Sequence, residues 1–341
     1  MIKESLAKLV RGEHLTESEM IATTNAIMEG RTSAAQIGSF LTALRLKGET
    51  VAEITGAARV MREKAVRINF KAPTVIDTCG TGGDGAQTFN ISTTVAFIIA
   101  AADIPVAKHG NRAISSRCGS ADVLEALGVK VDLPPEQVEV CLQETGIGFL
   151  FAPVFHQAMK HAAGPRKELG FRTVFNLLGP LTNPAAANCQ LVGVFDPALT
   201  EVVAQVLQRL GVERAVVVHG GGGLDELSLD GVNKASILRN GQVETIRFQA
   251  TDLGLSAAPK TALAGGGPQE NARITQAILQ GTEKGPRLDV VLLNAAAALL
   301  AADVVSDLKA GIAFARELVQ RGKAYAKLEQ LRQVGRQAQC S

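Results

Sequence analysis

The chain has 341 residues, enough for more than one compact hydrophobic core, and its 46% hydrophobic and 20% charged residues are ordinary for a globular protein. The formal net charge is only +2. A charge so close to zero argues against nucleic acid or a membrane surface as a partner, so any anion site must be built locally.

The first 70 or so residues predict helices. Three helix starts carry the capping-box pattern, Thr16 with Glu19, Ser33 with Gln36, and Thr50 with Glu53. After the second start, apolar residues recur at helical spacing at Ile37, Phe40, Leu41 and Leu44. No catalytic pattern is visible here. We therefore expect a small helical domain over residues 1–70 that packs against the rest of the chain or against a second subunit.

From Thr74 onward, short apolar runs alternate with helical patterns. Strands are predicted at Thr74 to Asp77, Ile104 to Lys108 and Ala215 to His219, and helices at Ser92 to Ala102 and from near Ser120. This alternation predicts an α/β domain over residues 71–341, with a mainly parallel sheet flanked by helices. Ligands bind at the carboxyl ends of such strands, and the polar clusters of this chain lie there.

Three later segments stand out. Residues 164–184 have a helical pattern that ends at prolines, and we expect about residues 164–186 to return to the N-terminal helices and complete the helical domain. Gly265 to Gln269 is the most loop-like internal segment. The longest apolar run, Val290 to Ala302, is shorter than the ~20 residues that span a bilayer, so we expect a buried helix.

The cysteines and the first residues bear on the compartment. The five cysteines are widely scattered and form no CxxC pair, which favours reduced thiols in the cytoplasm over zinc or a disulfide framework. The opening MIKESLAKLVRGEHLTESE carries charges throughout and lacks the apolar core of a signal peptide.

The first polar cluster runs from Asp77 to Thr93. Glycines at 80, 82, 83 and 85 follow the strand, and without Cβ atoms their backbone can approach a ligand and turn N–H groups toward it. Asn90, Ser92 and Thr93 then open a helix, where free amides favour an anion. The spacing fits neither a Walker A motif nor GxGxxG. The competing interpretation is a tight turn with an ordinary helix cap.

The second cluster begins at Lys108. Two cations, with His109 and Asn111 close by, follow a strand, and hydroxyls come after them: Lys108, His109, Asn111, Arg112, Ser115, Ser116 and Ser120. Cations and hydroxyls near a helix start suit a phosphate, and Ser120 is a candidate N-cap. The alternative is a solvated basic loop.

Two further clusters complete the candidate site. Asp225 and Glu226 are adjacent carboxylates after a glycine run, the hard oxygen ligands that Mg²⁺ prefers, although an exposed acidic pair is also commonplace. A fourth cluster could combine an apolar slot with one cation and so suit a flat aromatic acid, through His156, Met159, Arg166, Gly179 and Pro180. For a lone His or Arg on a helix, a structural role is the competing interpretation.

Five motifs occur in the order of one known family. They are GTGGD at 80–84, KHGNR at 108–112, SADVLEALG at 120–128, RTVFNLLGPLTNP at 172–184 and GLDE at 223–226. Together they resemble the anthranilate phosphoribosyltransferase family over nearly the whole chain. The resemblance implies a homodimer formed through the helical domain and an active site between the two domains. It also implies transfer of the phosphoribosyl group of 5-phosphoribosyl 1-pyrophosphate (PRPP) to the amine of anthranilate, with release of pyrophosphate, in tryptophan biosynthesis.

The resemblance also implies site residues. PRPP would be bound by Gly80, Gly83, Asp84, Thr88, Asn90, Ser92, Thr93, Lys108 and Ser120. Anthranilate would be bound by Gly80, His109, Asn111, His156, Arg166, Gly179 and Pro180. Mg²⁺ would be held by Ser92, Asp225 and Glu226. Two departures, Gln157 for the family's usual proline and Pro165 for its usual valine, fall on the anthranilate side.

No acid–base catalytic set is evident, which agrees with an amine acceptor that is already nucleophilic when neutral. Two alternatives remain. One is an enzyme like the pyrimidine nucleoside phosphorylases of the same fold group, against which the GLDE carboxylates and the KHGNR loop argue. The other is a non-catalytic PRPP-binding paralogue, against which the full set of polar residues argues.

Overall fold

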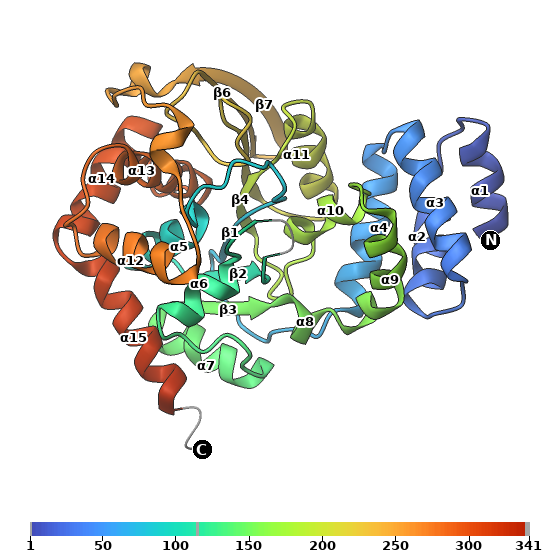
Figure 1. Ribbon diagram of the computed structural model, residues 1–341, viewed down its shortest axis with the longest axis horizontal. Helices are drawn as coiled ribbons and strands as arrows, with labels where there is room; N and C mark the ends of the chain where they lie inside the picture. Colours follow the sequence, from blue (N-terminus) through green and yellow to red (C-terminus); the bar gives the residue numbers. More distant parts are fainter. Residues whose placement is uncertain (1, 114–115, 338–341) are drawn as a thin grey trace.

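The computed structural model describes residues 2–113 and 116–337, and Figure 1 shows a helical part beside a larger α/β part. In the first half, the helices are α1 (Ile2–Val10), α2 (Glu17–Met28), α3 (Ala34–Lys47), α4 (Val51–Lys64), α5 (Ile91–Ala101), α6 (Ser120–Ala126), α7 (Pro135–Thr145), α8 (Ala152–Phe155) and α9 (Lys160–Leu169). They continue with α10 (Phe175–Leu178), α11 (Leu199–Arg209), α12 (Pro268–Leu279), α13 (Pro286–Ala301), α14 (Leu308–Gln320) and α15 (Lys323–Gln337). The strands are β1 (Ile76–Gly80), β2 (Val106–Gly110), β3 (Ile147–Phe151), β4 (Cys189–Gly193), β5 (Arg214–His219), β6 (Val232–Arg239) and β7 (Gln242–Gln249).

The N-terminal helices begin where the sequence predicts. Thr16, Ser33 and Thr50 each accept a hydrogen bond from the backbone N–H three residues on, and the Glu or Gln side chain there accepts one from the backbone N–H of the cap residue. All three capping boxes are confirmed. They are local devices, so the sequence alone can specify them.

The segment 164–184, predicted to be helical and to end at prolines, is two short helices and a turn. Helix α9 ends at Gly170, whose φ of 65° is left-handed, and α10 is followed by a 3₁₀ turn at Gly179–Leu181. The helix ends there because glycine at a helix C-terminus readily adopts the left-handed conformation. The prediction missed this break. Helix α9 packs against α2 and α3, and α10 packs against α4 (Figure 1). The division of the chain into residues 1–70 plus 164–186, and 71–341, stays a prediction.

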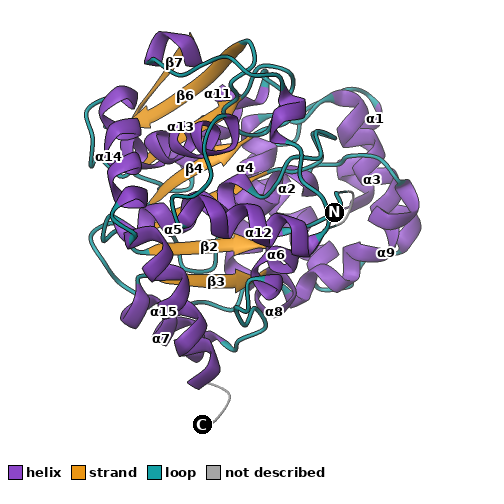
Figure 2. Ribbon diagram, turned by 60° about the vertical axis from the view of Figure 1, so that its left-hand side comes forward, coloured by secondary structure: helices purple, strands orange, loops and turns teal. Residues whose placement is uncertain are grey.

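The sheet has the order β3-β2-β1-β4-β5-β6-β7. Figure 2 shows β3 and β2 toward one end of the sheet and β6 and β7 toward the other. The first five strands of this order are parallel, whereas β6 and β7 form an antiparallel hairpin at one edge. This confirms the predicted small helical domain beside a mainly parallel sheet flanked by helices. Strand β1 extends to Gly80, beyond the predicted end at Asp77, because it pairs with β4 as far as Gly193.

Alternate residues of the central strands face two hydrophobic cores. Leu191 and Val216 pack into one core with α5, α13 and α15. Val192 and Val217 face the opposite core, which is continuous through α11 into the N-terminal helices. The helical part is therefore joined to the sheet by a shared apolar core, which places it beside the carboxyl ends of the strands.

Two other predictions concern apolar runs and thiols. The Val290–Ala302 run lies within the buried helix α13, as predicted. No helix of the described ranges is both long and apolar enough to cross a membrane. The described cysteines, Cys79, Cys118, Cys141 and Cys189, are free thiols, and Cys340 lies outside the described residues.

Candidate active site

The carboxyl ends of the central strands carry glycines because another loop lies directly on them. A Cβ atom on Gly193 would fall 1.5 Å from the carbonyl oxygen of Asp225, and one on Gly80 would fall 2.5 Å from its Oδ2. The loop with the predicted metal ligands is thus seated on the ends of β1 and β4.

The first and third predicted clusters meet at this point. Asp225 Oδ2 accepts a hydrogen bond from Gly82 N at 2.7 Å, and Glu226 Oε1 accepts one from Ser92 N at 3.1 Å. Asp225 N donates to Asp84 Oδ2 at 3.4 Å. Segments 140 residues apart in the sequence therefore form one acidic, amide-rich surface.

Negative charge in this cluster is poorly neutralised. Burial raises the pKa of Asp225 well above its ordinary value, and the neighbouring Asp84 and Glu226 raise it further. Burial also raises the pKa of Glu226 to about 7, although Lys108 opposes the rise. The described residues contain no ready-made group of three or more His, Cys, Asp or Glu side chains for a metal. Mg²⁺ usually takes only one or two carboxylates and completes its shell with phosphate and water, so this pair fits it.

Two predicted PRPP ligands are buried. Lys108 is 3% exposed, and its Nζ donates to the carbonyl oxygen of Thr78. Burial lowers the pKa of Lys108, and the neighbouring Asp77 opposes that change. Thr93 is likewise buried within α5. In this structure Lys108 therefore lies beneath the surface of the predicted site, with its ammonium group bound to the backbone.

Asp77, the first residue of the first predicted cluster, lies near Lys108, although the sequence analysis assigned it no role. Asp77 accepts hydrogen bonds from His109 N at 3.1 Å and from Asn183 Nδ2 at 2.8 Å. Asn183 Nδ2 also donates to the carbonyl oxygen of Ala107 at 2.7 Å. This network ties β1 and β2 to the segment that follows the Gly179–Pro180 turn.

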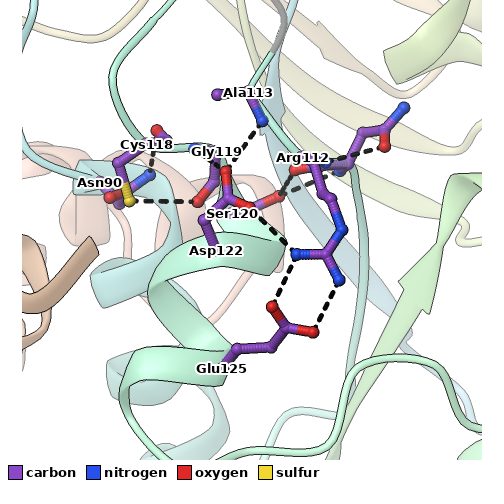
Figure 3. Close-up of polar contacts among 9 residues, drawn as sticks. Asn90, Arg112, Ala113, Cys118, Gly119, Ser120, Asp122 and Glu125 are labelled. Carbon is purple, nitrogen blue, oxygen red and sulfur yellow. Dashed lines mark hydrogen bonds and ion pairs between the residues drawn. The ribbon is translucent and has the colours of Figure 1, made fainter. Parts of the chain in front are cut away.

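The second cluster forms a loop whose two ends are joined by hydrogen bonds to Asp122, which we call the clamp (Figure 3). Asp122 Oδ2 accepts from Gly119 N at 2.8 Å and from Ala113 N at 2.9 Å. Arg112 makes a two-pronged ion pair with Glu125 at 2.6 and 2.7 Å. Arg112 is therefore occupied within the protein, and the base of the loop is fixed by Asp122, which the sequence analysis missed.

Ser120 is not the N-cap that the sequence suggested. Gly119 precedes α6 in that position, and the Ser120 hydroxyl accepts from Asn111 N at 3.1 Å. A Cβ on residue 119 would lie 2.3 Å from Ala113 N, which explains why glycine occupies the cap. Ser120 and Asn111, predicted for different substrates, are thus adjacent. Ser115 lies outside the described residues.

The loop after β1 carries the remaining predicted PRPP ligands. Gly83 has a left-handed φ of 75° and lies against the guanidinium of Arg172, which stacks on Phe195 at 4.0 Å. Thr88 makes an isolated bridge with Ala264. Arg172 was part of a recognised motif, but nothing in the sequence placed it beside this loop.

All seven predicted anthranilate ligands line one cavity of about 520 Å³ between the helical part and the sheet. They are Gly80, His109, Asn111, His156, Arg166, Gly179 and Pro180. Met159 and Gln157, one of the departures from the family pattern, line it as well. Since Gly80 also contacts Asp225, the cavity adjoins the acidic cluster.

His109 and His156 form part of the wall, with ring centroids 4.9 Å apart and ring planes tilted by 55°. Burial, and then His156, lowers the pKa of His109 to about 3, so the ring is neutral. His109 Nδ1 lies 3.1 Å from the carbonyl oxygen of Gly179. A carbonyl only accepts, so Nδ1 carries the proton and Nε2 is an acceptor. Nε2 is buried without a hydrogen-bond partner among the described residues.

Arg166 supplies the positive charge of the cavity from α9. Its guanidinium lies over the ring of Phe175 at 5.1 Å, and burial lowers its pKa. Within residues 2–113 and 116–337, no acidic side chain forms an ion pair with it, and burial is the only influence on its pKa. A partly buried cation without a counter-ion, set among apolar and aromatic side chains, suits an aromatic carboxylate.

Comparisons with known proteins match both the helical part and the α/β part of the chain. Residues 3–65 match the helical bundle domain of a glycosyl transferase family, and residues 72–325 match its α/β domain. Anthranilate phosphoribosyltransferase of Moorella thermoacetica is 58% identical over 96% of this chain and 97% of its own length. The Thermus thermophilus enzyme of the same name superposes with a TM-score of 0.92 at 47% identity, covering 97% of this chain and 99% of that one. The Saccharomyces cerevisiae enzyme, in complex with PRPP and Mg, gives a TM-score of 0.90 at 28% identity, covering 98% of each chain.

Proposed function

The chain belongs to the anthranilate phosphoribosyltransferase family, and from this premise we propose that it transfers the phosphoribosyl group of PRPP to the amine of anthranilate and releases pyrophosphate, a step of tryptophan biosynthesis. The observation that carries the proposal is the shared cavity. The cavity wall carries the neutral His109 ring and the Arg166 cation, and the cavity adjoins the acidic, amide-rich cluster. A transfer between two substrates requires two such neighbouring binding regions.

On the donor side, the chain would bind the two phosphorylated ends of PRPP through backbone amides and hydroxyls. The left-handed glycines 82, 83 and 85, the start of α5 at Asn90 and Ser92, and Ser120 present such groups. Asp225 and Glu226 would hold Mg²⁺, with Ser92 beside them. When bound, the metal would neutralise the leaving pyrophosphate.

On the acceptor side, Arg166 would bind the carboxylate of anthranilate, and Asn111 would lie near the donor loop. His109 Nε2, a buried acceptor without a partner in the described ranges, would accept an N–H of the aromatic amine. The neutral amine is itself the nucleophile, so holding it in line with C1 of the sugar, as the C1–O bond breaks, supplies most of the acceleration. Departures at Gln157 and Pro165 affect this side only.

The proposal is tested by mixing the protein with PRPP, anthranilate and Mg²⁺ and following the loss of anthranilate fluorescence. Omission of PRPP or Mg²⁺ should abolish the loss. Phosphate-dependent cleavage of a pyrimidine nucleoside, without loss of anthranilate, would instead identify a phosphorylase. Binding of PRPP with neither reaction would identify a non-catalytic paralogue.

We also propose a cytoplasmic homodimer joined through the helical part. Val10 on α1 and Leu46 on α3 are exposed by 77% and 83%, and these two helices pack side by side. Exposed apolar side chains on neighbouring helices of this part support a subunit interface there. Light scattering after size-exclusion chromatography should give twice the mass of the chain, and Leu46→Lys should reduce it to a monomer.

A further inference from the structure

Asn271 connects a distant helix to the proposed PRPP site. It lies in the first turn of α12, is 1% exposed, and belongs to none of the motifs that identify the family. Its Oδ1 accepts from Gly266 N at 2.7 Å, and its Nδ2 donates to Asn90 Oδ1 at 2.9 Å. Asn90 in turn donates from Nδ2 to the carbonyl oxygen of Cys118 at 3.2 Å (Figure 3 shows this last contact).

The polarity of this chain of hydrogen bonds is determined at both ends. Gly266 N can only donate, so the atom of Asn271 that faces it is the oxygen, and its amide nitrogen must face Asn90. Cys118 O can only accept, so the nitrogen of Asn90 faces it. Each amide therefore has one orientation, which an isolated Asn–Asn contact would leave undetermined.

This hydrogen-bond polarity fixes the side-chain amide of Asn90. Asn90 precedes α5 but makes no side-chain capping bond to it. One N–H of its amide is bound to Cys118, and the other has no hydrogen bond to a residue of the described ranges. If the amide rotated by half a turn, its oxygen would face Cys118 O and its nitrogen would face Asn271 Nδ2, and both contacts would be repulsive. Asn271 and the carbonyl of Cys118 thus act together to select the orientation in which Asn90 offers a donor, and loss of Asn271 leaves only the 3.2 Å contact with Cys118 to hold it.

The backbone around Asn271 supports the same segment independently. Gly265 N donates to Gln87 O at 3.0 Å, and a Cβ on Gly265 would lie 2.7 Å from the backbone of Phe89. The glycine turn before α12 is therefore packed tightly against the residues that lead into Asn90. The segment that looked most loop-like in the sequence is a fixed support.

We propose that Asn271 is a positioning residue for the sugar donor: it holds the Asn90 amide in the orientation that donates a hydrogen bond to PRPP. The inference rests on the proposed function, in which Asn90 contacts PRPP. Asn271 itself touches no substrate, so its effect should appear in donor binding and not in acceptor binding.

The test compares Asn271→Ala with Thr275→Val. Thr275 lies one turn along α12, is fully buried, and meets Thr94 Oγ1 of α5 at 3.0 Å, so the control also loses a buried hydrogen bond made by α12. For Asn271→Ala we expect the KM for PRPP to rise about tenfold, because one hydrogen bond to a charged ligand is lost. The KM for anthranilate should be unchanged. For Thr275→Val we expect both KM values to stay at the wild-type level although the thermal midpoint falls.

A double-mutant cycle shows whether the effect passes through Asn90. Adding Asn271→Ala to Asn90→Ala should raise the KM for PRPP no further, because the oriented group is already absent. An additive rise, equal changes in both KM values, or the same change in Thr275→Val would overturn the inference. If Asn271→Ala does not fold, Asn271→Ser, which is too short to bridge Gly266 and Asn90, replaces it in every comparison. Failure of the proposed function differs, since wild-type protein would then not consume anthranilate.

Discussion

Replacement of Arg166 by alanine should separate the binding of the two substrates. The guanidinium is the uncompensated cation of the 520 Å³ cavity, and it stacks on Phe175. A hydrogen-bonded contact with a charged group contributes about 1.5–3 kcal/mol, and about 1.4 kcal/mol corresponds to a tenfold change in affinity. Arg166→Ala should therefore raise the KM for anthranilate about 10- to 150-fold and leave the KM for PRPP close to its wild-type value.

The assay is steady-state loss of anthranilate fluorescence, with each substrate varied in turn. Lys167→Ala is the matched control, because it removes the same charge from the same helix at an exposed position outside the cavity. Aniline, which lacks the carboxylate, provides a second comparison. Wild-type protein should prefer anthranilate to aniline by a similar factor, and Arg166→Ala should lose that preference.

A rise of equal size in the KM values for anthranilate and PRPP would refute this reasoning, and so would an Arg166→Ala protein that still prefers anthranilate to aniline. The stability of the variant should change little, since removal of a partly buried charge relieves desolvation while the stacking on Phe175 is lost.

Three further predictions concern the supports of the site and the fold. Gly193→Ala should lower kcat about 100-fold and raise the Mg²⁺ requirement, because the new Cβ would displace Asp225; wild-type activity in a Mg²⁺ titration would contradict this. Asp122→Asn should raise the KM for PRPP about tenfold, because it loosens the loop that presents Ser120. Glu125→Gln breaks only an exposed ion pair and should leave this KM unchanged. Equal KM values for the two variants would count against the role of Asp122. Burial alone would raise the pKa of Glu53, but the hydrogen bonds from Lys47 and from the backbone lower that pKa below the ordinary 4.5. The ionised Glu53 therefore stabilises the fold above pH 4.5, and this stabilisation is lost as the pH falls through the lowered pKa. Glu53→Gln should therefore reduce the free energy of unfolding by about 3 kcal/mol at pH 7, and denaturant titrations should show the difference shrinking in acid; a difference independent of pH would be inconsistent with this account.

Much of the fold was predictable because its signals are local or periodic. Capping boxes such as Thr50 with Glu53 act within one turn, and the alternation of strand and helix indicates a parallel sheet whose carboxyl ends share one edge. That geometry is why polar clusters at Asp77 to Thr93 and at Asp225 could be expected to meet. The antiparallel hairpin of β6 and β7 was missed, although its turn at Asn240 and Gly241, both with positive φ, is a typical hairpin signal.

The supports of the site were not predictable from the sequence. Asn271, Asn183 and Asp122 are common residue types, and their partners become neighbours only after the chain has folded. Burial is also a property of the folded chain. Lys108 could be recognised as a cation after a strand, but its position beneath the site surface, beside Asp77, depends on the packing of other elements.

The position of α9 along the chain has a consequence for synthesis on the ribosome. Its Ala162 shares a core with Ile27 and Leu41, yet 95 residues separate the end of α4 at Lys64 from the start of α9 at Lys160. At about 5–20 residues per second, the apolar face that α9 covers stays uncovered for roughly 5–20 s after α4 has been made. During this time the apolar face of the nascent chain is accessible at the ribosome exit, where a chaperone could bind it. The first four helices complete their packing only after translation has passed β3, the third strand in the sequence.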